Sequence, residues 1–248
     1  MFTQIDAIFL DVGNTLRILL EDDQEHRAKA RRRIVELLGA DADPEEFCAE
    51  LDRRYKTYRK WAFKERVEAH EPELWTRWLA PDFPAEQVAA NAVELTYQYR
   101  QSMGRRVVAE DGAMVVKELY ARGYTLGIIS NVITSREIPD WLESDGLDQY
   151  FKSVALSSVL GVRKPARAIY DYATSQAGVR PEHSAYVGDN LDRDITGTRE
   201  AGFGAVVILL HEGDARAQGE DGGRPDVIIR SLGELLDIFP PRYQGREV

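Results

Sequence analysis

The first hydrophobic run of the chain is short and continuous. Apolar residues fill positions 5 and 7–10, and the run stops at Asp11, which Val-Gly-Asn-Thr follows. Such a run is typical of a central parallel strand that is covered on both faces. Gly13 and Asn14 tolerate a tight backbone, so the carboxylate of Asp11 is expected to project from the end of this strand. A lone Asp is more often a turn or helix-cap residue. Whether Asp11 is catalytic therefore depends on which residues follow the later strands.

Between residues 21 and 106 the apolar positions follow helical spacing, and no segment is a convincing strand. A helix is predicted over 24–38, with Gly39 as its C-terminal cap. Asp43 and Pro44 predict the N-cap and first residue of a second helix that runs to residue 62 or beyond. Further helices are expected over 74–79 and 84–103. These segments predict an all-helical insertion.

Strands and helices then alternate regularly. Strands are predicted over 124–129, 153–156, 184–187, 205–209 and 227–229, and helices over 112–122, 134–144, 166–178, 193–201 and 232–238. This alternation predicts an α/β fold with a doubly wound, parallel, Rossmann-like sheet. The first strand precedes the insertion but must pair with strands that follow it. We therefore expect a discontinuous core of residues 1–17 and 106–248, with residues 18–105 as an all-helical cap domain over the strand ends.

Composition narrows the class of protein. The 248 residues carry a net charge of −10, which argues against a nucleic-acid-binding surface. Cys48 is the only cysteine, so an intramolecular disulfide is impossible. No window approaches the ~20 apolar residues of a membrane span, and the first apolar run is too short for a signal peptide. We expect a cytoplasmic monomer or homodimer that binds a small anionic substrate and neither nucleic acid nor membrane.

Polar residues gather where four of the predicted strands end. The clusters are Asp11 to Thr15, Ser130-Asn131, Lys164-Pro165, and Gly188-Asp189 with Asp192 and Asp194. Ligands of open α/β sheets bind at these carboxyl ends, so the clusters are expected to form one site. A carboxylate can act as a nucleophile towards phosphorus, while a lysine and a hydroxyl hold the phosphoryl oxygens. Further carboxylates can hold Mg²⁺, which prefers oxygen ligands.

These four motifs, in this order and with a helical insertion after the first, resemble the haloacid dehalogenase-like hydrolase superfamily. The resemblance covers the core by sequence and the cap by its placement. It implies that Asp11 is the nucleophile, that Thr15 supports the loop, and that the backbone around Gly13 and Asn14 faces the phosphate. It also implies that Ser130 binds the phosphoryl group, with the backbone of Asn131 beside it.

The resemblance further implies a charge-balancing lysine and a magnesium site. Lys164 would offset the charge of Asp11 and of the phosphoryl group. Asp11, Asp189, Asp194 and the backbone carbonyl of Gly13 would form the shell of Mg²⁺, and Asp192 ranks below Asp194. The implied reaction is hydrolysis of a small phosphorylated metabolite through an aspartyl phosphate.

One position departs from the phosphatase pattern. Phosphatases of this superfamily usually carry a second Asp two residues after the nucleophile, and this chain has Gly13 there. General acid–base catalysis is worth about 10²–10⁴ in rate, so slow turnover of alkyl phosphates is expected. Surrogate acids are available at the start of the insertion: Glu21, Asp22, Asp23 and His26.

Three other activities stay open at this point. Phosphonoacetaldehyde hydrolases have a small residue at this position and use a cap lysine, for which Lys29, Lys56, Lys60 and Lys64 are available. Haloacid dehalogenases lack the Gly-Asp metal motif, so Gly188-Asp189 argues against dehalogenation. A non-catalytic member that keeps the phosphate and metal site for binding is the third alternative.

Overall fold

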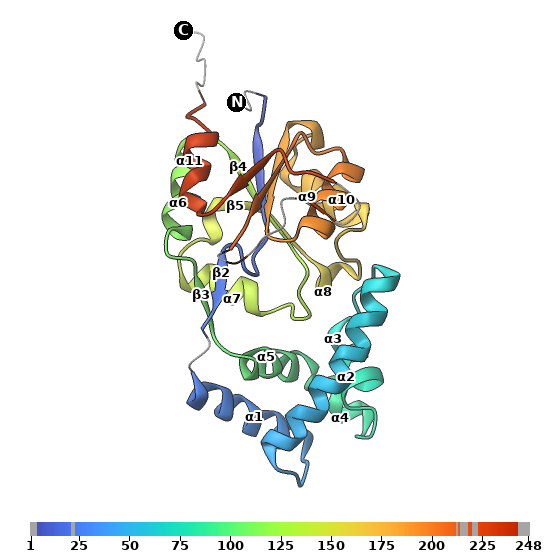
Figure 1. Ribbon diagram of the computed structural model, residues 1–248. Helices are drawn as coiled ribbons and strands as arrows, with labels where there is room; N and C mark the ends of the chain where they lie inside the picture. The colour runs from blue at the N-terminus through green and yellow to red at the C-terminus, as the bar shows by residue number, and fades with distance from the viewer. Residues whose placement is uncertain (1–3, 21–22, 212, 214–217, 220–222, 243–248) are drawn as a thin grey trace.

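The computed structural model describes residues 4–20, 23–211, 213, 218–219 and 223–242. Its centre is a six-stranded sheet of parallel neighbours in the order β5-β4-β1-β6-β7-β8 (Figure 1). The strands are β1 (Ala7–Leu10), β4 (Thr125–Ser130), β5 (Phe151–Leu156), β6 (Ser184–Gly188), β7 (Ala205–Leu209) and β8 (Val227–Ile229). This topology confirms the predicted doubly wound sheet. The strand order reverses at β1 and β6, which is where such folds open a crevice at the strand ends.

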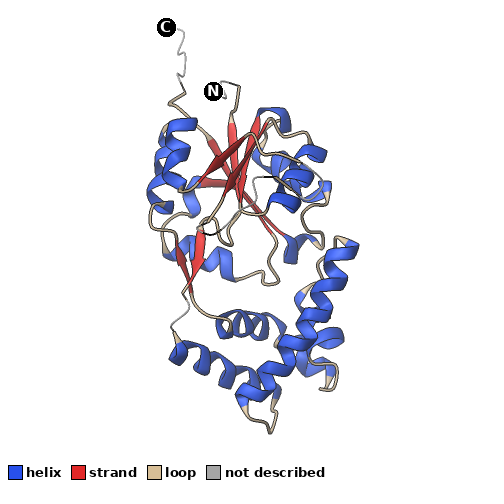
Figure 2. Cartoon of the chain, viewed as in Figure 1, coloured by secondary structure: helices blue, strands red, loops and turns tan. Residues whose placement is uncertain are grey.

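Alternate residues of β1 face two separate apolar layers. Ile8 and Leu10 pack with α6 (Gly112–Ala121), α7 (Glu137–Ser144) and α11 (Leu235–Ile238). Ala7 and Phe9 pack with α9 (Arg167–Ala177) and α10 (Leu191–Ala201) on the opposite face (Figure 2). All four residues are completely buried. The continuous apolar run therefore follows from a strand that is covered on both sides.

The helical insertion consists of α1 (Gln24–Leu38), α2 (Pro44–Glu65), α3 (Glu71–Glu73), a π-helical turn η1 (Leu74–Leu79), α4 (Ala85–Ala90) and α5 (Ala92–Ser102). The predicted caps are confirmed: Gly39 closes α1 in the left-handed conformation, and the side chain of Asp43 accepts hydrogen bonds from two backbone N–H groups of α2. The predicted helix over 84–103 is interrupted at Asn91. These helices bury an apolar cluster of their own, separate from the two layers of the sheet.

An antiparallel ribbon joins the insertion to the core, and the sequence analysis missed it. Its strands are β2 (Arg17–Leu19) and β3 (Arg106–Val108). Each has three residues, and none of the six is buried, so the ribbon leaves no alternating pattern in the sequence. Among the described residues, no helix is long and apolar enough to cross a membrane.

A second contact between insertion and core lies away from this ribbon, and we call it the seam: residues 66–71 against residues 157–163. Val67 and Val162 form an antiparallel bridge, and the N–H of Glu68 donates to the carbonyl of Gly161 at 3.0 Å. The carboxylate of Glu68 accepts hydrogen bonds from Tyr58 and from Ser157, and it pairs with the guanidinium of Arg163 at 3.3 Å.

Burial dominates the electrostatics of the seam. The Glu68 side chain is 1% exposed. Burial raises the pKa of Glu68 even though Arg163 and two hydroxyl donors oppose that shift. The seam includes the short helix α8 (Ser157–Leu160), for which the sequence analysis expected a loop.

The starts of α7 and α10 differ from the predictions in a way that bears on the seam and on the site. The helix α7 begins at Glu137 and not at Thr134, because the Thr134 hydroxyl accepts the N–H of Arg136 and Ser135 binds Glu71 of the seam. The helix α10 begins at Leu191, two residues before the predicted start. Asn190 caps it by accepting the N–H of Arg193 at 2.8 Å.

Candidate active site

Asp11 leaves the sheet directly after β1, where its backbone is still held by the neighbouring strand. Its N–H donates to the carbonyl of Val187 at 2.8 Å, and its Oδ1 accepts the N–H of Val12 at 2.8 Å. The side chain is buried. In the loop that follows, Asn14 adopts φ 54°, which Asn tolerates better than most residues. Gly13 does not need a positive φ, so the expected tight backbone falls on Asn14.

Lys164 lies beside Asp11 and is completely buried. Its Nζ is 2.7 Å from Asp11 Oδ2 and 3.5 Å from Asp194 Oδ1, and it donates to the hydroxyl of Tyr186. Burial and the charge of Asp11 raise the pKa of Tyr186 well above its usual value, so this hydroxyl stays neutral. Tyr186 was predicted only as part of a buried strand, and its contact with Lys164 was missed.

The side chain of Asn131 fixes the backbone of Lys164. Its Oδ1 accepts the N–H of Lys164 at 2.8 Å, and its Nδ2 donates to the carbonyl of Lys164 at 3.0 Å. Ser130, the last residue of β4, is buried just before it. The second and third motifs of the sequence are therefore joined by a pair of hydrogen bonds.

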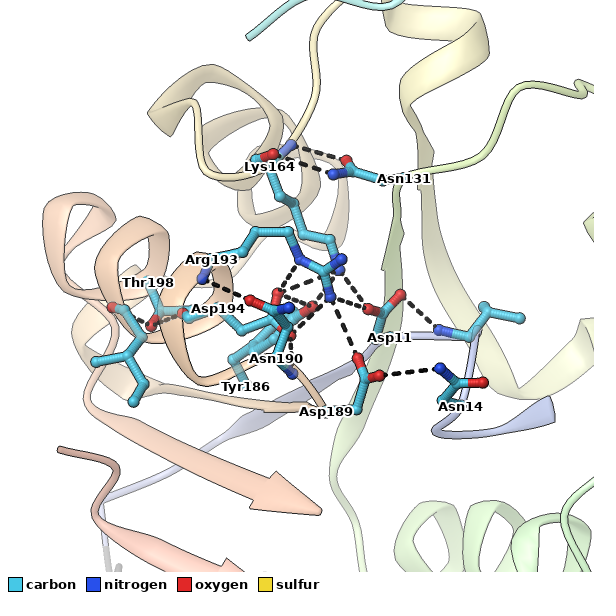
Figure 3. Close-up of polar contacts among 12 residues, drawn as sticks. Asp11, Asn14, Asn131, Lys164, Tyr186, Asp189, Asn190, Arg193, Asp194 and Thr198 are labelled. Atoms are coloured by element: carbon cyan, nitrogen blue, oxygen red, sulfur yellow. Dashed lines mark hydrogen bonds and ion pairs between the residues drawn. The ribbon is translucent and has the colours of Figure 1, made fainter. Parts of the chain in front are cut away.

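Three carboxylates converge at the ends of β1 and β6. Asp11, Asp189 and Asp194 each offer one oxygen, and these oxygens all lie within 4.8 Å of one another (Figure 3). Burial would raise the pKa of Asp194, but Arg193 and Lys164 outweigh it and lower that pKa to about 2. Burial and then the charge of Asp11 raise the pKa of Asp189.

Arg193 reaches into this cluster, which the sequence analysis did not anticipate. Its Nη2 lies 2.8 Å from Asp11 Oδ2, 3.3 Å from Asp189 Oδ1 and 2.9 Å from Asp194 Oδ2. Its Nε donates to Asp194 Oδ1 at 2.7 Å. Burial disfavours its charge, but Asp194 and Asp11 keep the pKa of Arg193 well above the usual value. The only signal in the sequence was its position between two acids at a helix start.

The glycine of the last motif is required by close packing. A Cβ on Gly188 would lie 2.4 Å from Asp194 Oδ2 and 2.8 Å from Tyr186 Cε1. Only glycine lets the buried carboxylate of Asp194 approach the end of β6 so closely.

The other predicted residues divide between the site and its surroundings. The Asn14 side chain donates to Asp189 Oδ2 at 3.3 Å, and Gly13 is exposed in the same loop. Thr15 is fully buried, and its Oγ1 has no hydrogen-bond partner. Asp192 lies in the first turn of α10 and contributes no carboxylate to the cluster of three.

Of the four residues considered as surrogates for the missing Asp, the two that the structure describes make contacts elsewhere. Glu21 and Asp22 lie outside the described residues. Asp23 caps α1 and pairs with Arg105 at 3.3 Å, while His26 contacts Gln101 at 2.9 Å. Both side chains are therefore engaged away from Asp11.

The donor set fits a hard divalent cation. Carboxylate oxygens are the ligands that Mg²⁺ prefers, and three of them converge on one small region. The resident guanidinium of Arg193 contacts the same three carboxylates, so a metal and this side chain use the same groups.

Known proteins resemble this chain along nearly its whole length. It is 28% identical over 241 residues to a glyceraldehyde 3-phosphate phosphatase of Methanopyrus kandleri, covering 94% of this chain and 97% of that protein. Its fold matches the magnesium-bound putative HAD-hydrolase YfnB of Bacillus subtilis with a TM-score of 0.59 and 21% identity, over 95% of this chain and 98% of that one. It matches a 2-haloacid dehalogenase of Pseudomonas syringae pv. Tomato DC3000 with a TM-score of 0.67 and 21% identity, over 94% of this chain and 97% of that one.

The family model described as haloacid dehalogenase-like hydrolase matches residues 81–208, just over half of the chain. This match agrees with the sheet order, with the helical insertion after β1 and with the convergence of Asp11, Lys164, Asp189 and Asp194 at one edge of the sheet. The chain therefore belongs to the haloacid dehalogenase-like hydrolase family.

Proposed function

We propose that this protein is a magnesium-dependent phosphatase that acts on small phosphorylated metabolites through an aspartyl phosphate on Asp11. The observation that carries the proposal is the position of the Asp11 carboxylate, 2.7 Å from the buried ammonium of Lys164 and within 4.8 Å of oxygens from Asp189 and Asp194. The phosphatase relative of Methanopyrus kandleri supports the same reaction class.

In the proposed first step, an oxygen of Asp11 attacks phosphorus. A new bond forms between that oxygen and phosphorus, and the bond between phosphorus and the leaving oxygen breaks. Lys164 offsets negative charge beside Asp11, while Ser130 and the backbone N–H groups of Gly13 and Asn131 hold the phosphoryl oxygens. The N–H of Asn14, also expected to face the phosphate, donates instead to the carbonyl of Arg17 at 2.9 Å. Water then attacks the aspartyl phosphate, which releases phosphate and restores the carboxylate.

Asp11, Asp189, Asp194 and the carbonyl of Gly13 would hold Mg²⁺, which when bound supplies positive charge against the phosphoryl oxygens. Tyr186 and Asn131 position Lys164 from two sides, at its side chain and at its backbone. In this arrangement residues 1–17 and 106–248 form the catalytic core, and residues 18–105 form a cap over it.

Gly13 sets the limit on this reaction. A leaving alkoxide needs a proton, and position 13 has no side chain to donate one. Asp23 and His26 are engaged elsewhere. We therefore expect the enzyme to favour substrates with good leaving groups and to hydrolyse its aspartyl phosphate slowly.

Intact mass spectrometry tests the proposal after incubation with magnesium and acetyl phosphate. We expect the wild type to gain one phosphoryl group and Asp11→Asn to gain none. Asp6→Asn is the matched control, because Asp6 lies just before the other end of β1 and pairs with Arg242. The absence of both a mass gain and phosphate release in the wild type would overturn the proposal.

Carbon–phosphorus cleavage is less well supported. A lysine that forms a Schiff base near neutral pH normally has a pKa lowered by its surroundings. The four candidate lysines are all exposed to solvent: Lys29, Lys56, Lys60 and Lys64. The similarity to a haloacid dehalogenase is below 25% identity and extends to the fold alone.

A further inference from the structure

Arg193 makes contacts that differ from those of the other arginine on the same helix. Its guanidinium bonds to three carboxylates that come from the ends of β1 and β6 and from α10 itself. Arg199, about one and two-thirds turns later, points to the surface and pairs with Asp226 at 2.9 Å. The position of Arg193 is fixed by the cap of α10, since Asn190 accepts its backbone N–H. The helix start therefore directs this side chain into the acidic cluster.

The contact of Arg193 reduces the net negative charge of the carboxylate cluster. Three carboxylates face two cations, Lys164 and Arg193, so the cluster carries one net negative charge when all five groups are ionised. Unpaired carboxylates this close together would repel one another strongly in a buried site. Exchange of the guanidinium for a divalent cation would bring the same cluster to neutrality.

The two cations differ in how readily they can leave. Lys164 is completely buried and is held at its backbone and at its side chain. The side chain of Arg193 is 18% exposed, and within the described part of the chain the three carboxylates are the groups that bind its guanidinium. A long side chain at the edge of a site can turn towards solvent without disturbing the fold.

We propose that Arg193 is a resident counter-cation that competes with the divalent metal, so that the metal binds only by displacing the guanidinium from Asp11, Asp189 and Asp194. The resident guanidinium stabilises the metal-free protein by pairing with these carboxylates. It also weakens the apparent affinity for metal, because the guanidinium and the metal compete for the same carboxylates. The proposal rests on the metal cluster of the proposed function and is independent of its phosphoryl chemistry.

Calorimetric titration with Mg²⁺ measures the competition directly. We expect Arg193→Gln to bind Mg²⁺ about tenfold or more tightly than the wild type, because one positive charge beside the carboxylates is removed. Arg199→Gln is the matched control and should bind as the wild type does. Equal or weaker binding by Arg193→Gln, or no binding by either protein, overturns the proposal.

Thermal unfolding gives a second measurement. Without metal, Arg193→Gln should melt at a lower temperature than the wild type, and saturating Mg²⁺ should raise its melting temperature by more. An equal rise in both proteins contradicts the competition.

The wild type alone provides a test if Arg193→Gln does not fold. The Arg193 Nε–H donates to Asp194 at 2.7 Å and should exchange slowly with solvent in a nitrogen-15 NMR spectrum. Mg²⁺ should abolish this protection, and its persistence at saturating Mg²⁺ overturns the proposal. If Asp11 forms no phosphoenzyme, the proposed function fails while these binding results stand unchanged.

Discussion

Restoring an acid at position 13 is the most direct test of why this site should turn over slowly. Gly13 is exposed, its φ is not positive, and a Cβ built on it meets no heavy atom within 4 Å. The Cβ of an Asp at this position therefore displaces neither Asp11 nor its neighbours. General acid–base catalysis contributes about 10²–10⁴ in rate. We expect Gly13→Asp to raise kcat for alkyl phosphates by an amount within that range.

The leaving group identifies the cause of any gain. An aryl phosphate such as para-nitrophenyl phosphate needs little protonation as it leaves, so its first step should gain little, whereas an alkyl phosphate should gain the full factor. Phosphate release at saturating Mg²⁺, combined with the pre-steady-state burst, separates this step from hydrolysis of the aspartyl phosphate. Gly13→Asn is the matched control, because it has the same shape without the acid. A folded, metal-loaded Gly13→Asp with no gain, or with the same gain as Gly13→Asn, refutes the argument.

Four further predictions test buried groups of the core and of the insertion. Glu68→Ala leaves Arg163 as an uncompensated charge in the seam. We therefore expect the free energy of unfolding, measured in urea, to fall by about 3–5 kcal/mol, and a loss below about 1 kcal/mol contradicts a buried ion pair. Burial raises the pKa of Glu68, so the stabilisation by its protonated form is present below about pH 4.5 and is lost as pH rises through the folded pKa. The difference in unfolding free energy between wild type and Glu68→Gln should therefore shrink over that pH window. A widening difference refutes the upward direction of the pKa shift. Burial raises the pKa of Cys48 to about 12, so a thiol reagent should label the native protein at least ~10³ times more slowly than the unfolded chain. Equal labelling rates contradict the raised pKa of this thiol. Gly188→Ala forces Asp194 to move, and we expect Mg²⁺ affinity to fall by about 10–100-fold. Unchanged Mg²⁺ affinity in Gly188→Ala refutes the close approach of Asp194 to the end of β6.

The position of the site could be predicted from the sequence because the geometry of a parallel sheet largely determines where the site lies. Asp11 and Asp189 are far apart in the chain, but each comes within two residues of the end of a predicted strand. Carboxyl ends of parallel strands share one edge, so strand prediction alone brings these two carboxylates together. Lys164 is separated from its strand by α8, and its motif alone predicted its place beside Asp11. Their roles in catalysis stay predictions that the mass spectrometry and substitution experiments address.

Arg193 could not be predicted in the same way, because its direction depends on where a helix starts. Hydrophobic spacing predicts that this helix begins at residue 193, whereas it begins two residues earlier, at Leu191, with Asn190 as its N-cap. A shift of two residues rotates a helical side chain by more than half a turn, which decides whether it faces solvent or the cluster. Helix starts are set by cap hydrogen bonds that compete with one another locally, and hydrophobic spacing does not distinguish them.

The seam was missed for a different reason and changes how the insertion must be understood. Its side-chain hydrogen bonds and ion pair come from polar and charged residues, and Glu68 at 1% exposure would be expected at the surface from its residue type alone. Arg163 binds Glu68 of the insertion through its side chain, and its N–H donates to the carbonyl of Arg66 at 3.2 Å. The next residue is Lys164, the cation beside Asp11. One peptide bond therefore separates a residue that anchors the insertion from the residue that balances the charge of the nucleophile. Movement of the insertion at the seam would act on the Glu68–Arg163 pair and on the backbone hydrogen bond of Arg163, one residue before Lys164. The position of the insertion and the electrostatics at Asp11 are consequently coupled through the backbone of residues 163 and 164.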